Sequence, residues 1–162
     1  MKKLIPLIVI AVVAILLAVL LWPKNHPAAS FSLNNLNGKP VSNAALPGKV
    51  TLINFWYPSC PGCVSEMPKI IKTAKDYAGK DFQVIGIAEP YDSLESVKNY
   101  VAERGISFTI AYDQNGQSGK AFGTQVYPTS FLINKQGEVL KTFVGEPDFA
   151  QLYQQIDQEL AK

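Results

Sequence analysis

The sequence predicts an α/β fold with a central mixed β-sheet that is covered by helices on both faces. Short apolar runs rich in β-branched and aromatic residues alternate with stretches of helical apolar periodicity. Such alternation favours parallel pairing in the middle of a sheet. Near the carboxyl end, two apolar runs flank Lys135-Gln136-Gly137, which is typical of a hairpin and adds antiparallel pairing.

The first predicted elements are a hairpin and a buried strand. Phe31-Ser32-Leu33 and Lys39-Pro40-Val41 flank Asn37-Gly38, a strong indication of a two-residue turn. After a turn at 46–49, the run Val50 to Trp56 is apolar enough for an interior strand covered on both faces.

A helix is predicted from Pro61 to about Ala78. Pro61 suits the first helical turn, and Pro68 inside the segment should kink it. Gly79 ends the helix. Its apolar face is formed by Ile70, Ile71, Ala74 and Tyr77.

The alternation then continues to the end of the chain. Ser93 to Arg104 is predicted as an amphipathic helix that Gly105 closes, with Leu94, Val97 and Val101 facing inward. The other predicted elements are strands over 82–88 and 108–111, a short helix over 118–122, strands over 129–134 and 138–144, and a last helix with Asp148 as N-cap and Phe149, Leu152, Ile156 and Leu160 on one face.

Composition indicates one globular domain with an appendage. Of the 162 residues, 48% are hydrophobic, and 15 basic residues nearly balance 13 acidic ones. No basic stripe with interleaved aromatic residues occurs, so nucleic acid is not expected as a partner. We expect the protein to be a monomer.

The appendage is an apolar amino-terminal run from Leu4 to Trp22, preceded by Lys2 and Lys3. As a helix it would be about 28 Å long, close to the thickness of a bilayer core. We therefore expect a single-pass anchor in the cytoplasmic membrane over 1–22, a linker over 23–30 and a globular domain over 31–162. The lysines favour a cytoplasmic amino terminus, so the domain would lie on the outer side.

A cleaved signal peptide is the alternative for this run. The apolar stretch is longer than the usual 7–15 or so residues of a signal peptide, which favours the uncleaved anchor. No cysteine follows the run directly, which excludes a lipid-anchored lipoprotein. Under either reading the domain is exported, and an exported dithiol needs a partner that supplies or removes electrons.

The chemistry of the chain is predicted to reside in its two cysteines, Cys60 and Cys63, which have Cys-x-x-Cys spacing. Cys60 falls where the strand over 50–56 gives way to the helix. The unpaired N–H groups of a first helical turn favour a thiolate there, and the thiolate is the reactive form. Two cysteines at this spacing can also form a disulfide, so the pair predicts a redox site.

Two alternatives for the cysteine pair are weaker. Tetrahedral zinc needs four ligands, and the chain has no third cysteine and a single histidine, His26, far from the pair. We therefore expect no metal and no cofactor. A purely structural disulfide would close a very short loop and stabilise the fold little.

The residues Asn54-Phe55-Trp56, Cys60-Pro61-Gly62-Cys63, Glu66-x-Pro68 and Tyr127-Pro128-Thr129-Ser130-Phe131-Leu132-Ile133 are similar to those of the membrane-anchored TlpA/ResA/DsbE (CcmG) group. The resemblance covers about 31–160. It implies a thioredoxin-like fold with Cys60 and Cys63 as catalytic residues, supported by Trp56, Pro61 and Gly62.

The resemblance also gives meaning to Tyr127, Pro128 and Glu89. It implies a cis peptide bond at Tyr127-Pro128, with Pro128 against the cysteines. Glu89 matches a glutamate that ends a strand near the pair; the alternative is a solvated carboxylate. Burial would raise the pKa of Glu89 and suit it to proton transfer. Ser59 departs from the group, which usually has an aromatic residue before the first cysteine.

The predicted reaction is thiol–disulfide exchange, in which Cys60 attacks a substrate disulfide. Cys63, one turn inward and expected to be less exposed than Cys60, resolves the mixed disulfide. No Lys, Arg or His lies between Leu52 and Met67, so the thiolate depends mainly on the helix terminus. A moderately acidic thiol favours a reductase. The resemblance implies a membrane electron donor of the DsbD/CcdA type and apocytochrome c, with its Cys-x-x-Cys-His haem site, as a possible substrate.

Two other functions remain open. A thiol peroxidase of the same superfamily would need a Thr-x-x-Cys loop and a nearby arginine; here Tyr57 occupies the threonine position, and Arg104 is the only arginine. A non-enzymatic metal chaperone is disfavoured by the lack of a histidine near the cysteines.

Overall fold

The computed structural model of the protein describes residues 12–13 and 25–162. The expected membrane anchor over 1–22 therefore lies outside the described residues, apart from Val12 and Val13, which are helical. Within the described ranges, no helix combines the length and the apolar character needed to cross a membrane.

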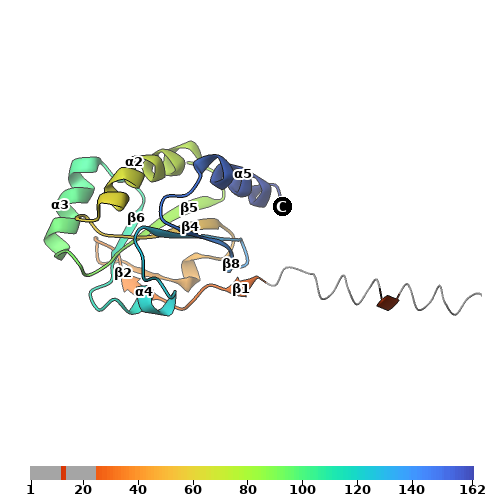
Figure 1. Ribbon diagram of the computed structural model, residues 1–162, viewed down its shortest axis with the longest axis horizontal. Coiled ribbons are helices and arrows are strands. Elements are labelled where there is room, and N and C mark those ends of the chain that lie inside the picture. The colour runs from red at the N-terminus through yellow and green to blue at the C-terminus, as the bar shows by residue number, and fades with distance from the viewer. Residues whose placement is uncertain (1–11, 14–24) are drawn as a thin grey trace, which may run out of the picture.

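The centre of the domain is a mixed sheet, as predicted (Figure 1). In residues 25–162 its six strands lie in the order β1-β8-β7-β4-β5-β6. β4 pairs in parallel with β5, which pairs in parallel with β6, whereas β7, β8 and β1 add antiparallel pairs. The strands are β1 (His26–Pro27), β4 (Val50–Trp56), β5 (Phe82–Ala88), β6 (Thr109–Tyr112), β7 (Thr129–Ile133) and β8 (Glu138–Val144).

The two faces of the sheet are covered differently. The long helices α2 (Pro61–Asp76), α3 (Leu94–Arg104) and α5 (Phe149–Leu160) pack on one face, where their buried side chains join those of the strands in one core cluster (Figure 1). The opposite face carries a second core cluster. It is covered by the hairpin β2 (Ser32–Asn34) and β3 (Pro40–Ser42), the 3-10 turn η1 (Asn43–Ala45) and the short helix α4 (Gln117–Ala121).

Local signals explain the helix boundaries. The Ser93 hydroxyl accepts the Ser96 N–H at the start of α3, and Gly105 ends that helix in the left-handed conformation that glycine tolerates. Asp148 caps α5 as predicted. One side chain differs from the prediction: Leu94, in the first turn of α3, is 38% exposed, so only Val97 and Val101 of the predicted stripe reach the core.

Part of the segment expected to be a linker belongs to the sheet. His26 pairs with Val139 and Pro27 with Glu138, so β1 extends the sheet beyond β8. Ala28, whose N–H donates to the Gly137 carbonyl oxygen, is buried. The chain is therefore tied to the domain from about residue 26 onward.

Candidate active site

The two cysteines lie where β4 ends and α2 begins, as the sequence predicts. Cys60 is the N-cap residue of α2, and its Sγ accepts the backbone N–H of Cys63 at 3.2 Å. The two sulfur atoms form a disulfide that closes the first helical turn. A thiolate at Cys60 would thus receive a hydrogen bond from the amino end of the helix, where the helix dipole also favours negative charge.

Exposure does not distinguish the two cysteines in this oxidised form. Cys60 is 3% exposed and Cys63 is 2% exposed, which contradicts the expectation that Cys60 is the accessible one. The reason is that both residues pack into the core cluster that also holds Trp56 and Met67. If Cys60 is the more reactive cysteine, the cause is therefore the helix terminus, which favours its ionisation, or a change in the surroundings of the pair when the disulfide is reduced.

Pro128 stands against the turn that holds the cysteines. The Tyr127-Pro128 peptide bond is cis, as expected. A Cβ atom added at Gly62 would lie 3.1 Å from Pro128 Cδ and 3.9 Å from the Tyr127 carbonyl oxygen. A side chain at position 62 would therefore crowd Pro128, and glycine allows this close approach.

The other residues near the cysteines have defined positions and contacts in the structure. Pro61 occupies the first turn of α2 and is exposed. Trp56 is 1% exposed, its ring packs on Tyr100 of α3, and its carbonyl oxygen accepts the Glu89 N–H. The Ser59 N–H, at the position where an aromatic residue is usual, donates to Asp92 Oδ2 at 2.8 Å.

Glu66 belongs to the site, although its place in the Glu66-x-Pro68 motif predicts no role for it. It is 1% exposed, and its Oε2 accepts Asn54 Nδ2 at 3.3 Å, while Asn54 also donates to Ser130 Oγ at 2.9 Å. Its Oε1 has no hydrogen-bond partner among the described residues. Burial raises the pKa of Glu66 to about 7, against the opposing effect of the Asn54 hydrogen bond.

The position of Glu66 in the helix could have revealed it. Glu66 lies three residues after Cys63, and residues three apart are neighbours on a helix surface. Cys63, Met67 and Ile70 belong to the buried face of α2, so Glu66 falls on the same face as Cys63. That spacing brings a carboxyl group to the helix face that carries the second cysteine.

Glu89 is buried rather than solvated. It follows β5 directly, is 3% exposed, and its Oε2 accepts the Tyr127 hydroxyl at 3.2 Å. Burial, reinforced by the Asp113 carboxylate, raises the pKa of Glu89 to about 7. Glu89 therefore reaches the active site through Tyr127, next to Pro128.

Three tyrosines form a cluster beside the cysteines. The ring centroids of Tyr57 and Tyr91 are 4.7 Å apart, and Tyr127 lies 5.4 Å from each of them. The Tyr57 carbonyl oxygen accepts the Cys60 N–H at 3.2 Å, so the cluster is joined directly to the reactive turn. Tyr91 is 64% exposed and gives the cluster an outer surface.

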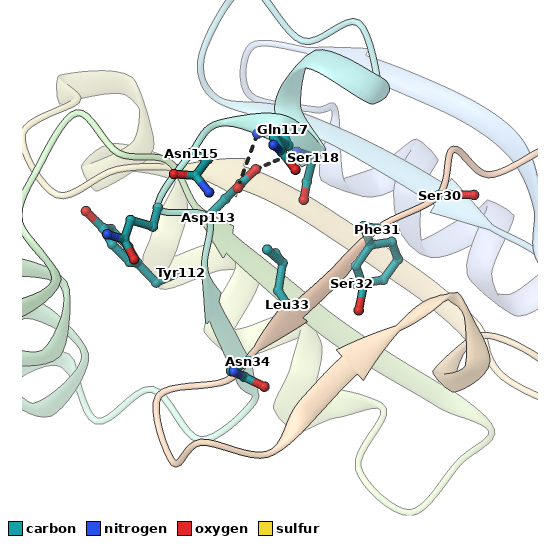
Figure 2. Close-up of a pocket in the computed structure, with 11 residues that line it drawn as sticks. Ser30, Phe31, Ser32, Leu33, Asn34, Tyr112, Asp113, Asn115, Gln117 and Ser118 are labelled. Atoms are coloured by element: carbon teal, nitrogen blue, oxygen red, sulfur yellow. Dashed lines mark hydrogen bonds between the residues drawn. The ribbon is translucent and has the colours of Figure 1, made fainter.

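A polar hollow of about 470 Å³ lies elsewhere, between β2 and the start of α4 (Figure 2). Neither cysteine lines it. At its edge the Asp113 carboxylate accepts the N–H groups of Gln117 and Ser118, at 3.2 and 2.6 Å, which fixes the beginning of α4 (Figure 2).

Comparisons with known proteins agree with this geometry. The model of the Redoxin family matches residues 23–156. The thiol-disulfide oxidoreductase ResA of Bacillus thuringiensis is 33% identical over 125 residues, which are 77% of this chain and 72% of that protein.

Two solved structures are also similar to the chain. A Neisseria meningitidis protein assigned as a thioredoxin is 62% identical with a TM-score of 0.79, over 85% of this chain and 93% of that one. A thiol:disulfide interchange protein of the thioredoxin family from Chlorobium tepidum is 33% identical with a TM-score of 0.76, over 85% and 98% of the two chains.

Proposed function

We propose that this chain, which belongs to the Redoxin family and is a thiol–disulfide oxidoreductase, reduces disulfides in client proteins outside the cytoplasm. It has the thioredoxin-like fold and carries the redox-active pair Cys60 and Cys63 at the amino end of α2. The observation that carries the direction of the reaction is the buried carboxyl group of Glu66, one helical turn from Cys63.

The reaction begins with the pair reduced. The Cys60 thiolate attacks one sulfur of the client disulfide, a mixed disulfide forms, and the other client sulfur leaves as a thiolate that takes a proton from solvent. Cys63 then attacks Cys60 Sγ, which releases the second client sulfur. The client gains two electrons and two protons, and the Cys60–Cys63 disulfide of the structure is the product.

Glu66 is the group placed to manage the proton of Cys63. The resolving thiol must be deprotonated before it attacks, and a base acts best when its pKa lies near the working pH. The pKa of Glu66, raised to about 7 by burial, meets that condition. Asn54 holds one carboxyl oxygen and leaves Oε1 free to accept the proton.

The surroundings of the pair favour reduction over oxidation. Cys60 is stabilised as a thiolate by the amino end of α2, and no basic residue lies between Leu52 and Met67. When ionised, Glu66 would oppose a nearby thiolate, because like charges disfavour one another. A weakly stabilised thiolate makes the reduced pair a good electron donor.

The amino-terminal run and the family resemblance support the cellular part of the proposal. A membrane tether over 1–22 would place the domain in an oxidising compartment, where a reductase needs a steady electron supply. A membrane electron donor of the DsbD/CcdA type would provide it. Apocytochrome c, whose haem site has a Cys-x-x-Cys pair, is the proposed client, so the protein would act in cytochrome c maturation.

A redox titration of the domain against glutathione or dithiothreitol tests the direction. We expect a reduction potential below about −200 mV, and a value near the roughly −120 mV of a strong oxidant such as DsbA would contradict the proposal. Insulin reduction and peroxide consumption, measured in parallel, separate a reductase from a thiol peroxidase. We expect turnover of insulin and none of peroxide.

Trapping identifies the client. The Cys63→Ala variant cannot resolve the mixed disulfide, so it should accumulate a covalent complex through Cys60 in the outer compartment. Mass spectrometry of that complex names the client, and the Cys60→Ala variant is the matched control that should trap nothing.

A further inference from the structure

Next to the tyrosine cluster lies a pocket of about 370 Å³ that the reaction above does not use. Tyr91 and Tyr127 form aromatic walls, Glu89 and Thr124 supply polar groups, and the exposed Lys120 stands at the edge. This pocket is distinct from the hollow of Figure 2, because the two share no lining residue.

Two of the residues that line this pocket each hold a buried polar atom without a hydrogen-bond partner in the described part of the chain. Within residues 25–162, neither Glu89 Oε1 nor Thr124 Oγ1 has a hydrogen-bond partner. An unpaired buried polar group is unfavourable, so a protein retains such groups where a ligand or water completes them. Glu89 is 97% buried, and its free oxygen is the stronger of the two acceptors.

The fold makes room for this carboxyl group. A Cβ atom at Gly119 would lie 2.6 Å from Glu89 Oε1 and 2.8 Å from Oε2. Any side chain at position 119 would therefore collide with the carboxyl group, and glycine lets α4 close over it. The Asp113 carboxylate accepts two N–H groups at the start of α4 and thereby fixes the position of this helix beside the Glu89 carboxyl group.

The buried charged residues at this pocket are acidic, whereas its basic residue is exposed. Glu89 and Asp113 are both buried carboxyl groups, and Asp113 raises the pKa of Glu89. Lys120 is the basic side chain that lines the pocket, and it is exposed to solvent. Tyrosine rings attract cations through their negative faces. The aromatic walls and the Glu89 carboxylate therefore both favour a positively charged occupant.

We propose that this pocket binds an arginine or lysine side chain of the client polypeptide, close to the cysteine that Cys60 attacks. The inference rests on the proposed function, because it names what the reductase recognises in its client. Tyr57 joins the two sites: its ring contacts Tyr91 and Tyr127, and its carbonyl oxygen accepts the Cys60 N–H. A polypeptide whose disulfide meets Cys60 therefore passes over the tyrosine cluster.

The test compares synthetic disulfide peptides that differ in one charge. Each peptide contains one Cys-Ala-Ala-Cys disulfide and carries arginine, or its neutral isostere citrulline, at one of the three positions before or after the cysteines. Rates of reduction by the reduced protein are measured at pH 8, where Glu89 is mostly ionised. At one or two positions we expect arginine to raise kcat/KM over citrulline by about fivefold or more.

Variants locate the preference in the pocket. Glu89→Gln and Tyr91→Ala should each bring the arginine-to-citrulline ratio close to one, whereas Lys120→Gln should increase it because a competing cation is removed. The matched control is Val144→Ala, an exposed residue of β8 outside the pocket, which should leave the ratio unchanged. Circular dichroism of each variant checks that the fold is retained.

The outcomes separate the two proposals. If the peptides are reduced but arginine and citrulline are equivalent at every position, the pocket does not bind a basic side chain and the inference fails, while the reductase function stands. A preference that persists in both Glu89→Gln and Tyr91→Ala would also overturn it. If no peptide is reduced, the proposed function fails and the inference fails with it.

Discussion

Two buried glutamates near the active site, Glu66 and Glu89, differ in the groups that their carboxyl oxygens contact. Glu66 is enclosed by α2, β4 and β7, with the amide of Asn54 on one oxygen. Glu89 accepts the Tyr127 hydroxyl, and the residue lines a pocket that opens to solvent. Burial raises the pKa of both to about 7.

A raised pKa does not by itself define the role of a buried carboxyl group. Both carboxyl groups are protonated more readily than an exposed glutamate, for the same physical reason. Their neighbours make the difference: Glu66 shares a helix face with Cys63, whereas Glu89 faces a space that a client side chain can enter. We therefore assign proton transfer to Glu66 and client binding to Glu89.

The largest effect is expected from removing the proton acceptor. Glu66→Gln should slow resolution of the mixed disulfide by about 100-fold or more, the lower end of general base contributions. Stopped-flow measurement of client release from the Cys60 mixed disulfide gives this rate. Glu89→Gln is the matched control and should lose less than about tenfold on a citrulline peptide. Equal losses in the two variants would contradict the division of roles.

The pH dependence of stability should reveal Glu66 next. Its folded pKa of about 7 lies above the unfolded value of 4.5, so the folded state keeps a proton that the unfolded chain releases. The resulting stability is fully present below about pH 4.5, declines as the pH rises, and is lost above about pH 7. The loss should be on the order of 3 kcal/mol.

Urea unfolding of the oxidised protein at pH 5 and pH 8 measures this term. Glu66→Gln should remove about half of the decline, because glutamine does not ionise while Glu89, whose pKa is raised to the same value, still does. The variant should therefore be relatively more stable at pH 8. A decline of unchanged size in the variant would show that Glu66 is not the group responsible.

The packing of α4 over Glu89 leaves no room for a side chain at position 119. Gly119→Ala places a methyl group 2.6 Å from Glu89 Oε1, so the helix or the carboxyl must move. The expected cost is about 1–3 kcal/mol of unfolding free energy. In a Glu89→Ala background the same substitution should cost much less, because the colliding group is gone. Additive effects in this double-mutant cycle would contradict the packing described.

The smallest effects are expected from the hydrogen bonds that hold each carboxyl in place. Ser130→Ala removes a partner of Asn54 and should cost about 1 kcal/mol, because the group is fully buried. Tyr127→Phe removes the bond to Glu89 and should cost less, since that bond is only partly buried. Thermal or urea unfolding compares the two, and the reverse order would indicate that Asn54 does not depend on Ser130.

Much of this architecture could be predicted because its signals are local. The strands over 50–56, 82–88 and 138–144 are apolar runs with clear ends, and the sequence places them at the observed residues. Pro61 and Asp148 mark helix starts through the chemistry of the residue itself. Leu94 was predicted wrongly, because periodicity assigns a face to the helix but does not show where along it the core ends.

The roles of the two glutamates could not be predicted in the same way. A glutamate in a helix is usually exposed, and the burial of Glu66 depends on Asn54 and Ser130, which β4 and β7 bring together from distant parts of the chain. For Glu89 the sequence allows a buried or a solvated carboxyl group, and the packing of Gly119 of α4 against it depends on the tertiary fold. The cysteines themselves were predictable because their spacing carries the chemistry.

The proposed mechanism depends on the amino end of α2, which makes Cys60 the attacking thiolate. Alkylation of the reduced, folded protein with iodoacetamide, followed by mass spectrometry of each cysteine as a function of pH, tests it directly. We expect Cys60 to react faster than Cys63 at neutral pH, because the amino end of α2 favours its thiolate. Equal rates at the two cysteines, or a faster rate at Cys63, would contradict the account.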